Sequence, residues 1–107
     1  MDLVFQALGH EARRRILDIV REMPGCGVND VCKYFEISRV AVIKHLNVLE
    51  EANLIISRKN GRVRELYFNV MPIQLIYDRW TSEYGALWAH HVADIKFLSE
   101  IKEKKNG

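Results

Sequence analysis

Residues 38–51 read SRVAVIKHLNVLEE, and this stretch decides the fold. Apolar residues recur along one edge of it with a helical period, at Val42, Leu46 and Leu49. Ser38 stands where an N-cap is expected, so we predict a helix that runs to about Ala52 and stops at Asn53. The polar edge of this helix is basic at its start and acidic at its end, which packing alone does not explain.

A shorter helix is predicted immediately upstream, over residues 28–35, with Asn29 or Asp30 as its cap. The link between the two helices, Glu36-Ile37, is very short. Two short helices joined by so tight a turn cross steeply instead of lying antiparallel. The pair therefore predicts a helix-turn-helix.

The N-terminal segment has a helical period that begins at Leu3 and is interrupted at Gly9. It predicts two helices, or one bent helix, ending near Met23, where Pro24-Gly25 stops it. His10 lies at a helix start, where a capping role or a solvent contact is expected.

A β-hairpin is predicted downstream, because a strand start at Leu54 is followed by Asn60-Gly61, the strongest short hairpin signal. The return strand is predicted from Arg62 to Val70, with inward positions at Leu66, Phe68 and Val70. A helix-turn-helix followed by a hairpin is a winged helix. The expected fold is mainly α (α+β), a winged helix-turn-helix with a two-stranded wing and long N- and C-terminal dimerisation helices.

The last predicted element is a helix over residues 72–101, opened by Pro72 at a position like the first of a helix. Its apolar side chains form one broad stripe: Ile76, Trp80, Tyr84, Leu87, Trp88 and Ile95. Left exposed, this stripe would exceed the apolar patch that monomers tolerate, so it predicts a homodimer. The first helix is expected to add to that interface through Leu3, Val4 and Leu8. The alternative is that the stripe packs back on its own domain.

The same stripe suggests a second role, because Trp80, Tyr84 and Trp88 could line a pocket between subunits for a small apolar effector. The alternative is plain core. With 107 residues and 49% hydrophobic residues, we expect one domain over residues 1–107. The N-terminus does not have the charge order of a secretory signal, and no apolar run is long enough for a membrane span. The expected compartment is the cytoplasm.

Positive charge is concentrated in the middle of the chain. The net charge is only +2, yet residues 38–64 hold six Lys or Arg and two Glu. In a winged helix the second helix enters the major groove of double-stranded DNA, and basic wing residues neutralise phosphates. The expected wing contacts are Arg58, Lys59, Arg62 and Arg64.

On the helix, Arg39 is the best candidate for base readout, since Arg can bind guanine in a bidentate manner. Ser38, Lys44 and Asn47 could contact bases or phosphates, and His45 could donate to a phosphate. The alternative for each residue is an ordinary solvated helix face.

Three stretches, LGHEARRRILDIV, VNDVCKYFEISRVAVIKHLNVLEEANLI and SRKNGRVRELYF, resemble the ArsR/SmtB family of bacterial winged-helix repressors over about residues 3–70. The resemblance implies a homodimer that binds an operator palindrome and represses transcription until an effector releases it. It implies DNA-facing positions at Ser38, Arg39, Ala41, Ile43, Lys44 and His45. Ile43 departs from the family, which often has Ser there, and could touch a thymine methyl.

Many members of this family sense metals, but the chain is similar to a subgroup without an obvious metal site. The family's thiolate pair falls on Gly27 and Asn29, with Cys26 and Cys32 nearby, so a soft-metal site is not expected. His90, His91 and Asp94 lie on the kind of helix that carries the other family site, yet the usual first ligands are missing. No metal and no cofactor are predicted, and a metal-responsive repressor stays as an alternative.

An enzyme is not expected, because the chain has no phosphate loop, no nucleophile beside a base and no metal motif. A winged helix used for protein–protein contact is the other alternative. The basic wing argues against it, and Ile43 supports it mildly. Salt dependence separates the two, since DNA binding weakens steeply with added salt.

Overall fold

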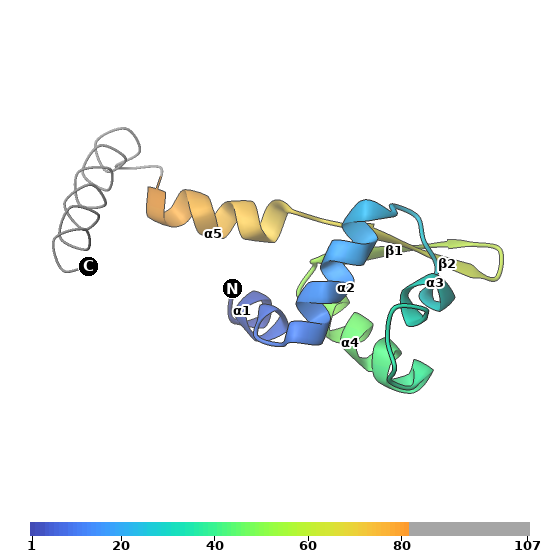
Figure 1. Cartoon of the computed structure of the whole chain (residues 1–107). Helices are drawn as coiled ribbons and strands as arrows, with labels where there is room; N and C mark the ends of the chain where they lie inside the picture. The colour runs from blue at the N-terminus through green and yellow to red at the C-terminus, as the bar shows by residue number, and fades with distance from the viewer. Residues whose placement is uncertain (82–107) are drawn as a thin grey trace, which may run out of the picture. The chain divides into compact units, whose positions relative to one another are not determined.

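The computed structural model describes residues 1–81, which Figure 1 shows in colour. The chain divides into two units, Met1–Gln74 and Leu75–Gly107, each of which is treated separately. The elements in chain order are α1 (Asp2–Leu8), α2 (Glu11–Glu22), α3 (Val28–Cys32), α4 (Arg39–Glu51), β1 (Ile55–Asn60), β2 (Val63–Phe68) and α5 (Met71–Thr81). Mostly helical, with a two-stranded antiparallel sheet, the chain has the winged helix-turn-helix fold expected from the sequence.

The N-terminal segment forms two helices, because the ends of α1 and α2 are separately capped. The His10 Nδ1 atom accepts a hydrogen bond from the Ala12 N–H at 3.1 Å, which confirms the expected cap. Arg13 donates from Nε to the Ala7 carbonyl and from Nη2 to the Gln6 carbonyl, both at 2.9 Å. Arg14 donates to the Leu8 carbonyl at 2.7 Å, so two arginines of α2 donate to carbonyls in the last turn of α1.

The helix-turn-helix consists of α3 and α4. Helix α3 begins after Gly27, whose N–H donates to the Asp30 carboxylate at 2.9 Å, so neither Asn29 nor Asp30 is the cap residue itself. It ends at Cys32, three residues earlier than predicted, which makes the link to α4 longer than two residues. Helix α4 begins as predicted, with the Ser38 Oγ accepting from the Ala41 N–H at 3.1 Å.

The wing is the hairpin of β1 and β2. Asn60 pairs with Val63, so the loop residues are Gly61 and Arg62, and not the expected Asn60 and Gly61. Gly61 has a φ of +65°, a conformation that glycine adopts without steric cost. The return strand ends at Phe68, and the expectation that Val70 points inward is wrong, since 50% of its surface is exposed.

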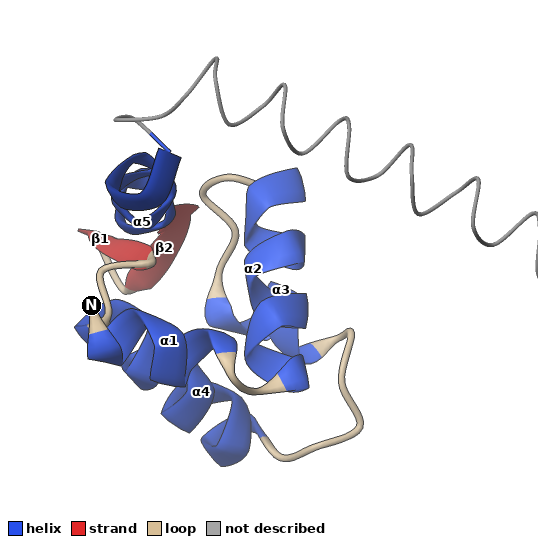
Figure 2. Ribbon diagram, turned by 90° about the vertical axis from the view of Figure 1, so that its left-hand side faces the viewer, coloured by secondary structure: helices blue, strands red, loops and turns tan. Residues whose placement is uncertain are grey.

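A short segment after α2 ties the wing to the helices. Leu66 of β2 donates its N–H to the Cys26 carbonyl at 2.9 Å, and the Leu66 carbonyl accepts from Gly25 at 2.8 Å. The large fully buried core side chains come from α2, α3, α4, the residue before β1 and the sheet: Ile16, Val20, Val31, Val42, Leu46, Leu49, Leu54, Ile55 and Leu66. Figure 2 shows helices α1 to α4 clustered beside the two red strands. This packing fixes the wing beside the start of α4 in the Met1–Gln74 unit.

Among residues 1–81, no helix has the length and apolar character needed to cross a membrane.

Candidate nucleic-acid interface

Helix α4 turns one edge to the core and the other to solvent. Val42, Leu46 and Leu49 are fully buried. The predicted contact residues Ser38, Arg39, Lys44 and Asn47 are exposed, while Ala41, Ile43 and His45 are half-buried. The apolar period of the sequence therefore places the predicted face of α4 outward, where a ligand as large as a DNA duplex can reach it.

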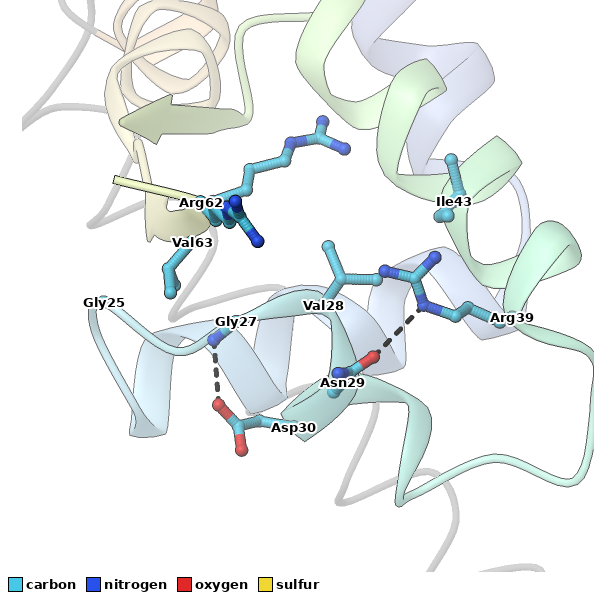
Figure 3. Close-up of a pocket in the computed structure, with 10 residues that line it drawn as sticks. Gly25, Gly27, Val28, Asn29, Asp30, Arg39, Ile43, Arg62 and Val63 are labelled. Atoms are coloured by element: carbon cyan, nitrogen blue, oxygen red, sulfur yellow. Dashed lines mark hydrogen bonds between the residues drawn. The ribbon is translucent and has the colours of Figure 1, made fainter. Parts of the chain in front are cut away.

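A groove of about 420 Å³ opens between the start of α4, the start of α3 and the wing, and is called the wing groove below. Its lining residues are Gly25, Gly27, Val28, Asn29, Asp30, Arg39, Ile43, Arg62, Val63 and Arg64. Figure 3 shows Arg39 and Ile43 on one side, with Arg62 and Val63 across from them. The fold thus brings together four of the predicted DNA contacts, Arg39, Ile43, Arg62 and Arg64, although the last two lie more than twenty residues from Arg39.

Arg39 does not extend freely into solvent. Its Nε atom donates a hydrogen bond to the Asn29 Oδ1 atom at 3.1 Å, drawn as a dashed line in Figure 3. This contact could not be predicted from the sequence, because the two residues lie ten positions apart on different helices. Helical spacing rules relate only residues within one helix.

Arg64 is held by contacts that the sequence did not predict. Its guanidinium forms an ion pair with the Glu50 carboxylate at the end of α4, and its Nε donates to the Ser57 Oγ at 2.9 Å. Ser57 in turn donates to Glu50. Only 28% of the Arg64 side chain and 30% of the Glu50 side chain are exposed, so Arg64 fastens the wing to α4. It has less freedom to meet a phosphate than its neighbours.

The other wing residues are exposed, as expected. Arg58 pairs across the hairpin with Glu65, whose carboxylate accepts a hydrogen bond from the Tyr67 hydroxyl at 2.7 Å. The Tyr67 hydrogen bond, followed by one from Asn60 and the charge of Arg58, lowers the pKa of Glu65. Within residues 1–81, no ion pair involves Lys59 or Arg62, so these two carry the least compensated charge on the wing.

These features match a known family. The bacterial regulatory protein, arsR family, matches residues 10–57, which include α2, α3 and α4. The HTH-type transcriptional regulator YuzN of Bacillus subtilis strain 168 is 38% identical, over 74% of this chain and 92% of the relative. The chain belongs to the ArsR family.

Two further relatives agree with this membership. The transcriptional repressor SdpR of Bacillus subtilis strain 168 is 30% identical, over 69% of this chain and 81% of the relative. An ArsR-like transcriptional regulator from Rhodococcus sp. RHA1 has a TM-score of 0.69 and 29% identity, over 92% of this chain and 89% of the solved chain. As an ArsR-family member the chain is a DNA-binding transcriptional regulator and not an enzyme, as the sequence predicted.

His45, an expected phosphate contact, faces the start of α2 in this ArsR-family chain. Its Nδ1 atom lies 3.4 Å from the Arg13 Nη1 atom, and its ring centroid lies 4.6 Å from that of His10. Burial, followed by His10 and then the Arg13 charge, lowers the pKa of His45. The ring is therefore held between two helices, which the sequence could not reveal because His45 lies 32 residues from Arg13.

The residues expected at a dimer interface of this ArsR-family chain fall into three groups. Leu3 and Trp80 are more than half exposed, at 52% and 60%, and Leu8 and Ile76 are half-buried. Val4 is only 7% exposed, because it packs in the core of its own unit, so it offers little surface to a partner. The remaining predicted residues, Tyr84, Leu87, Trp88 and Ile95, lie outside the described residues, as does part of the expected effector pocket.

Possible metal ligands of this chain lie both within the described residues and beyond them. Among residues 1–81, no group of three or more His, Cys, Asp or Glu is placed to hold a metal ion. Cys26 and Cys32 are half-buried free thiols, and burial followed by the charge of Asp30 raises the pKa of Cys26. His90, His91 and Asp94 lie outside the described residues.

Proposed function

We propose that this ArsR-family regulator is a homodimeric repressor that binds an inverted-repeat operator through α4 and the wing. In this proposal a small-molecule effector releases it from DNA, and it acts in the bacterial cytoplasm, where such an operator lies. The observation that carries the proposal is the wing groove, where Arg39 of α4 and Arg62 of the wing line one surface. The similarity to the repressor SdpR supports the direction of regulation.

Each part of the surface has its own task in this proposal. Helix α4 enters the major groove, where the terminal nitrogens of Arg39 meet a guanine edge. Ile43, half-buried in the wing groove, supplies an apolar contact suited to a thymine methyl. Lys59 and Arg62 neutralise phosphates, which sets the register on the duplex without reading sequence.

The two-fold symmetry of a homodimer would be repeated in the operator. Two copies of α4 would read half-sites about one helical turn of DNA apart. In the first unit, the exposed Leu3 of α1 would contribute to the proposed dimer interface. Trp80 of the second unit would also contact the partner copy, whereas the buried Val4 would not.

The first experiment is selection of binding sites from random duplex DNA by the full chain, repeated with two variants. We expect an enriched inverted repeat for the parent protein. Arg39→Ala should relax one base position in each half-site. Arg62→Ala should weaken all sequences about equally and reduce the salt slope of binding by about 2, because a homodimer loses one phosphate contact from each copy.

Arg21→Ala is the matched control for Arg62→Ala. Arg21 is exposed on α2 and pairs with Asp18 and Glu22, so its removal changes the net charge equally but away from the wing groove. We expect its salt slope to equal that of the parent. If nothing is enriched even at low salt, the proposal fails, and enrichment of single half-sites alone would overturn the homodimer. A promoter that carries the selected site should then be silenced by the protein, and its activation would overturn the repressor role.

A protein–protein interaction module is the second candidate, because exposed apolar residues flank the wing groove. Val40 of α4 and Val63 of β2 are both more than half exposed. An apolar contact of this kind would keep its affinity as salt is raised, since screening acts on charges. A partner bound equally well at low and high salt, in place of DNA, would favour this candidate.

A further inference from the structure

The contact between Asn29 and Arg39 joins the two helices of the helix-turn-helix at the wing groove. Asn29 is the second residue of α3, and Arg39 is the first residue of α4. The hydrogen bond from the Arg39 Nε to the Asn29 Oδ1 measures 3.1 Å, and both side chains line the groove. Asn29 of α3 thus holds Arg39 of α4, the candidate for base readout (Figure 3).

We propose that Asn29 is a positioning residue that fixes the Arg39 guanidinium for guanine, and this inference rests on the proposed function. An arginine has five N–H donors in a planar fork. With Nε engaged by Asn29, the pair of terminal nitrogens, Nη1 and Nη2, is left to meet the O6 and N7 atoms of guanine. The base is then read by one edge of the guanidinium and not by several.

Holding the side chain in advance also lowers the cost of recognition. A free arginine loses much rotamer freedom when it is fixed against a base. A contact already present in the unbound protein removes part of that loss, which sharpens discrimination more than it raises general affinity for DNA. Asn29 acts through Arg39, and the inference does not require Asn29 to touch the DNA.

The neighbouring acid does not compete for Arg39. Asp30 also lines the wing groove, but its carboxylate accepts from the Gly27 N–H at 2.9 Å and lies 3.7 Å from the Lys33 ammonium. The acceptor that meets Arg39 is therefore a neutral amide. A neutral acceptor orients the guanidinium without cancelling the charge that attracts DNA.

The test measures base discrimination at the position that Arg39 reads, as the ratio of affinities for guanine and for each other base there. We expect Asn29→Ala to lower this ratio about fivefold, which corresponds to about 1 kcal/mol, the typical net contribution of one intramolecular hydrogen bond. Asn29→Asp keeps the Oδ1 acceptor, so it should preserve the ratio while its added charge weakens binding to all sequences. If Asn29→Asp preserves the ratio that Asn29→Ala lowers, Asn29 acts by positioning Arg39 and not by a general structural role.

Two further variants complete the design. In an Arg39→Ala background, Asn29→Ala should have no effect on the ratio, which a double-mutant cycle measures. Lys33→Ala removes an exposed side chain from the same helix region without touching Arg39, and it should leave the ratio unchanged. If the parent selects a guanine through Arg39 and Asn29→Ala keeps the full ratio, the inference is overturned and the proposed function stands. If the parent selects no sequence at all, the proposed function itself has failed.

Discussion

Glu50 and Arg64 form an ion pair between the end of α4 and the wing. Glu50 ends the polar edge of α4, and Arg64 lies on the wing, fourteen residues later. Their ion pair, together with Ser57, joins the last turn of α4 to both strands. The acidic end of α4 therefore orients the wing relative to the helix. A recognition helix and a wing must both be correctly placed to contact one duplex.

The first prediction concerns this network. We expect Arg64→Ala to lower the free energy of unfolding by about 1–2 kcal/mol, because it removes charge-assisted hydrogen bonds at partly buried groups. Arg62→Ala, which removes an exposed arginine two positions away, should change the free energy by about 0.5 kcal/mol at most. Urea denaturation of the two variants measures the difference. Equal midpoints for both would show that the network adds nothing in solution.

The second prediction concerns His45. Its folded-state pKa is lowered below 6.5, so the unfolded chain binds more protons as the pH falls through that value. The contribution of His45 to the free energy of unfolding is therefore fully present above the pKa of His45 in the unfolded chain. It is lost as the pH drops toward the pKa of His45 in the folded protein. We expect the urea concentration at the unfolding midpoint to decrease as the pH is lowered from about 7.5 to about 5.5. We expect a smaller decrease in His45→Gln.

The groups that face the His45 ring are His10 and Arg13, both at the start of α2. Comparison of the His45→Gln and parent profiles cancels the titration of groups that lie away from this ring. The lowered pKa of Glu65 contributes stability that is lost only as the pH falls below 4.5, outside this window. Profiles of equal steepness for the parent and His45→Gln would contradict the prediction.

At this scale the sequence predicted which residues would be exposed and basic, but not their partners. Exposure follows from the helical spacing of the apolar residues, which is visible in the sequence. The contacts of Arg39, Arg64 and His45 join residues ten or more positions apart, and only the packed fold decides them. The sequence did not predict the partners that hold these three side chains, which are Asn29, Glu50 and Arg13.

At the scale of elements, helix ends were predictable where a side chain caps the backbone. Ser38 and His10 both accept from an N–H two or three residues on, as their positions indicated. The ends that rest on tertiary packing were misplaced. Helix α3 stops at Cys32, three residues earlier than predicted. The hairpin loop moves by one residue, because the pairing of β1 with β2 sets the register.

The third prediction separates the two possible tasks of Ser38. As the cap of α4 its hydroxyl accepts from Ala41, so Ser38→Ala should lower the free energy of unfolding by about 1 kcal/mol. Ser38→Asp restores the cap and favours the helix dipole, so it should return stability to the parent value. The same variant places a negative charge at the end of α4 that we propose faces DNA, and it should weaken DNA binding at low salt.

Urea denaturation and a salt titration of DNA binding, applied to both variants, give the two readouts. A Ser38→Asp protein that is stable and binds DNA as well as the parent would place the start of α4 away from the phosphates. Such a result would contradict the interface proposed for this helix.

At the scale of the whole molecule, the expected interface rests on apolar residues that the fold leaves exposed. The sequence grouped Leu3, Val4 and Leu8 together because a seven-residue helix offers little to tell its faces apart. The structure separates them, with Leu3 exposed and Val4 packed in the core. Burial in such a short helix depends on what it packs against, here α2 and α4, and the local period alone does not determine it.

The fourth prediction tests self-association through α1. Leu3 lies in the first turn of the helix and is 52% exposed, so Leu3→Glu should leave folding intact, since a negative charge is favourable at a helix N-terminus. We expect its dimer dissociation constant to rise about tenfold or more, because a charge would be buried without a partner at the interface. Sedimentation equilibrium over a range of concentrations measures this, and Gln6→Glu, on an exposed polar position of the same helix, is the matched control.

The same pair of variants connects assembly to function. A homodimer gains affinity for an inverted repeat from two linked half-sites, whereas a single half-site needs one copy of α4. Leu3→Glu should therefore lose affinity for the inverted repeat and keep its affinity for an isolated half-site, while Gln6→Glu keeps both. If Leu3→Glu remains as dimeric as the parent, α1 does not belong to the interface. If the parent is a monomer at every concentration and on the inverted repeat, the homodimer itself is excluded, and the apolar surface of α1 must serve another contact.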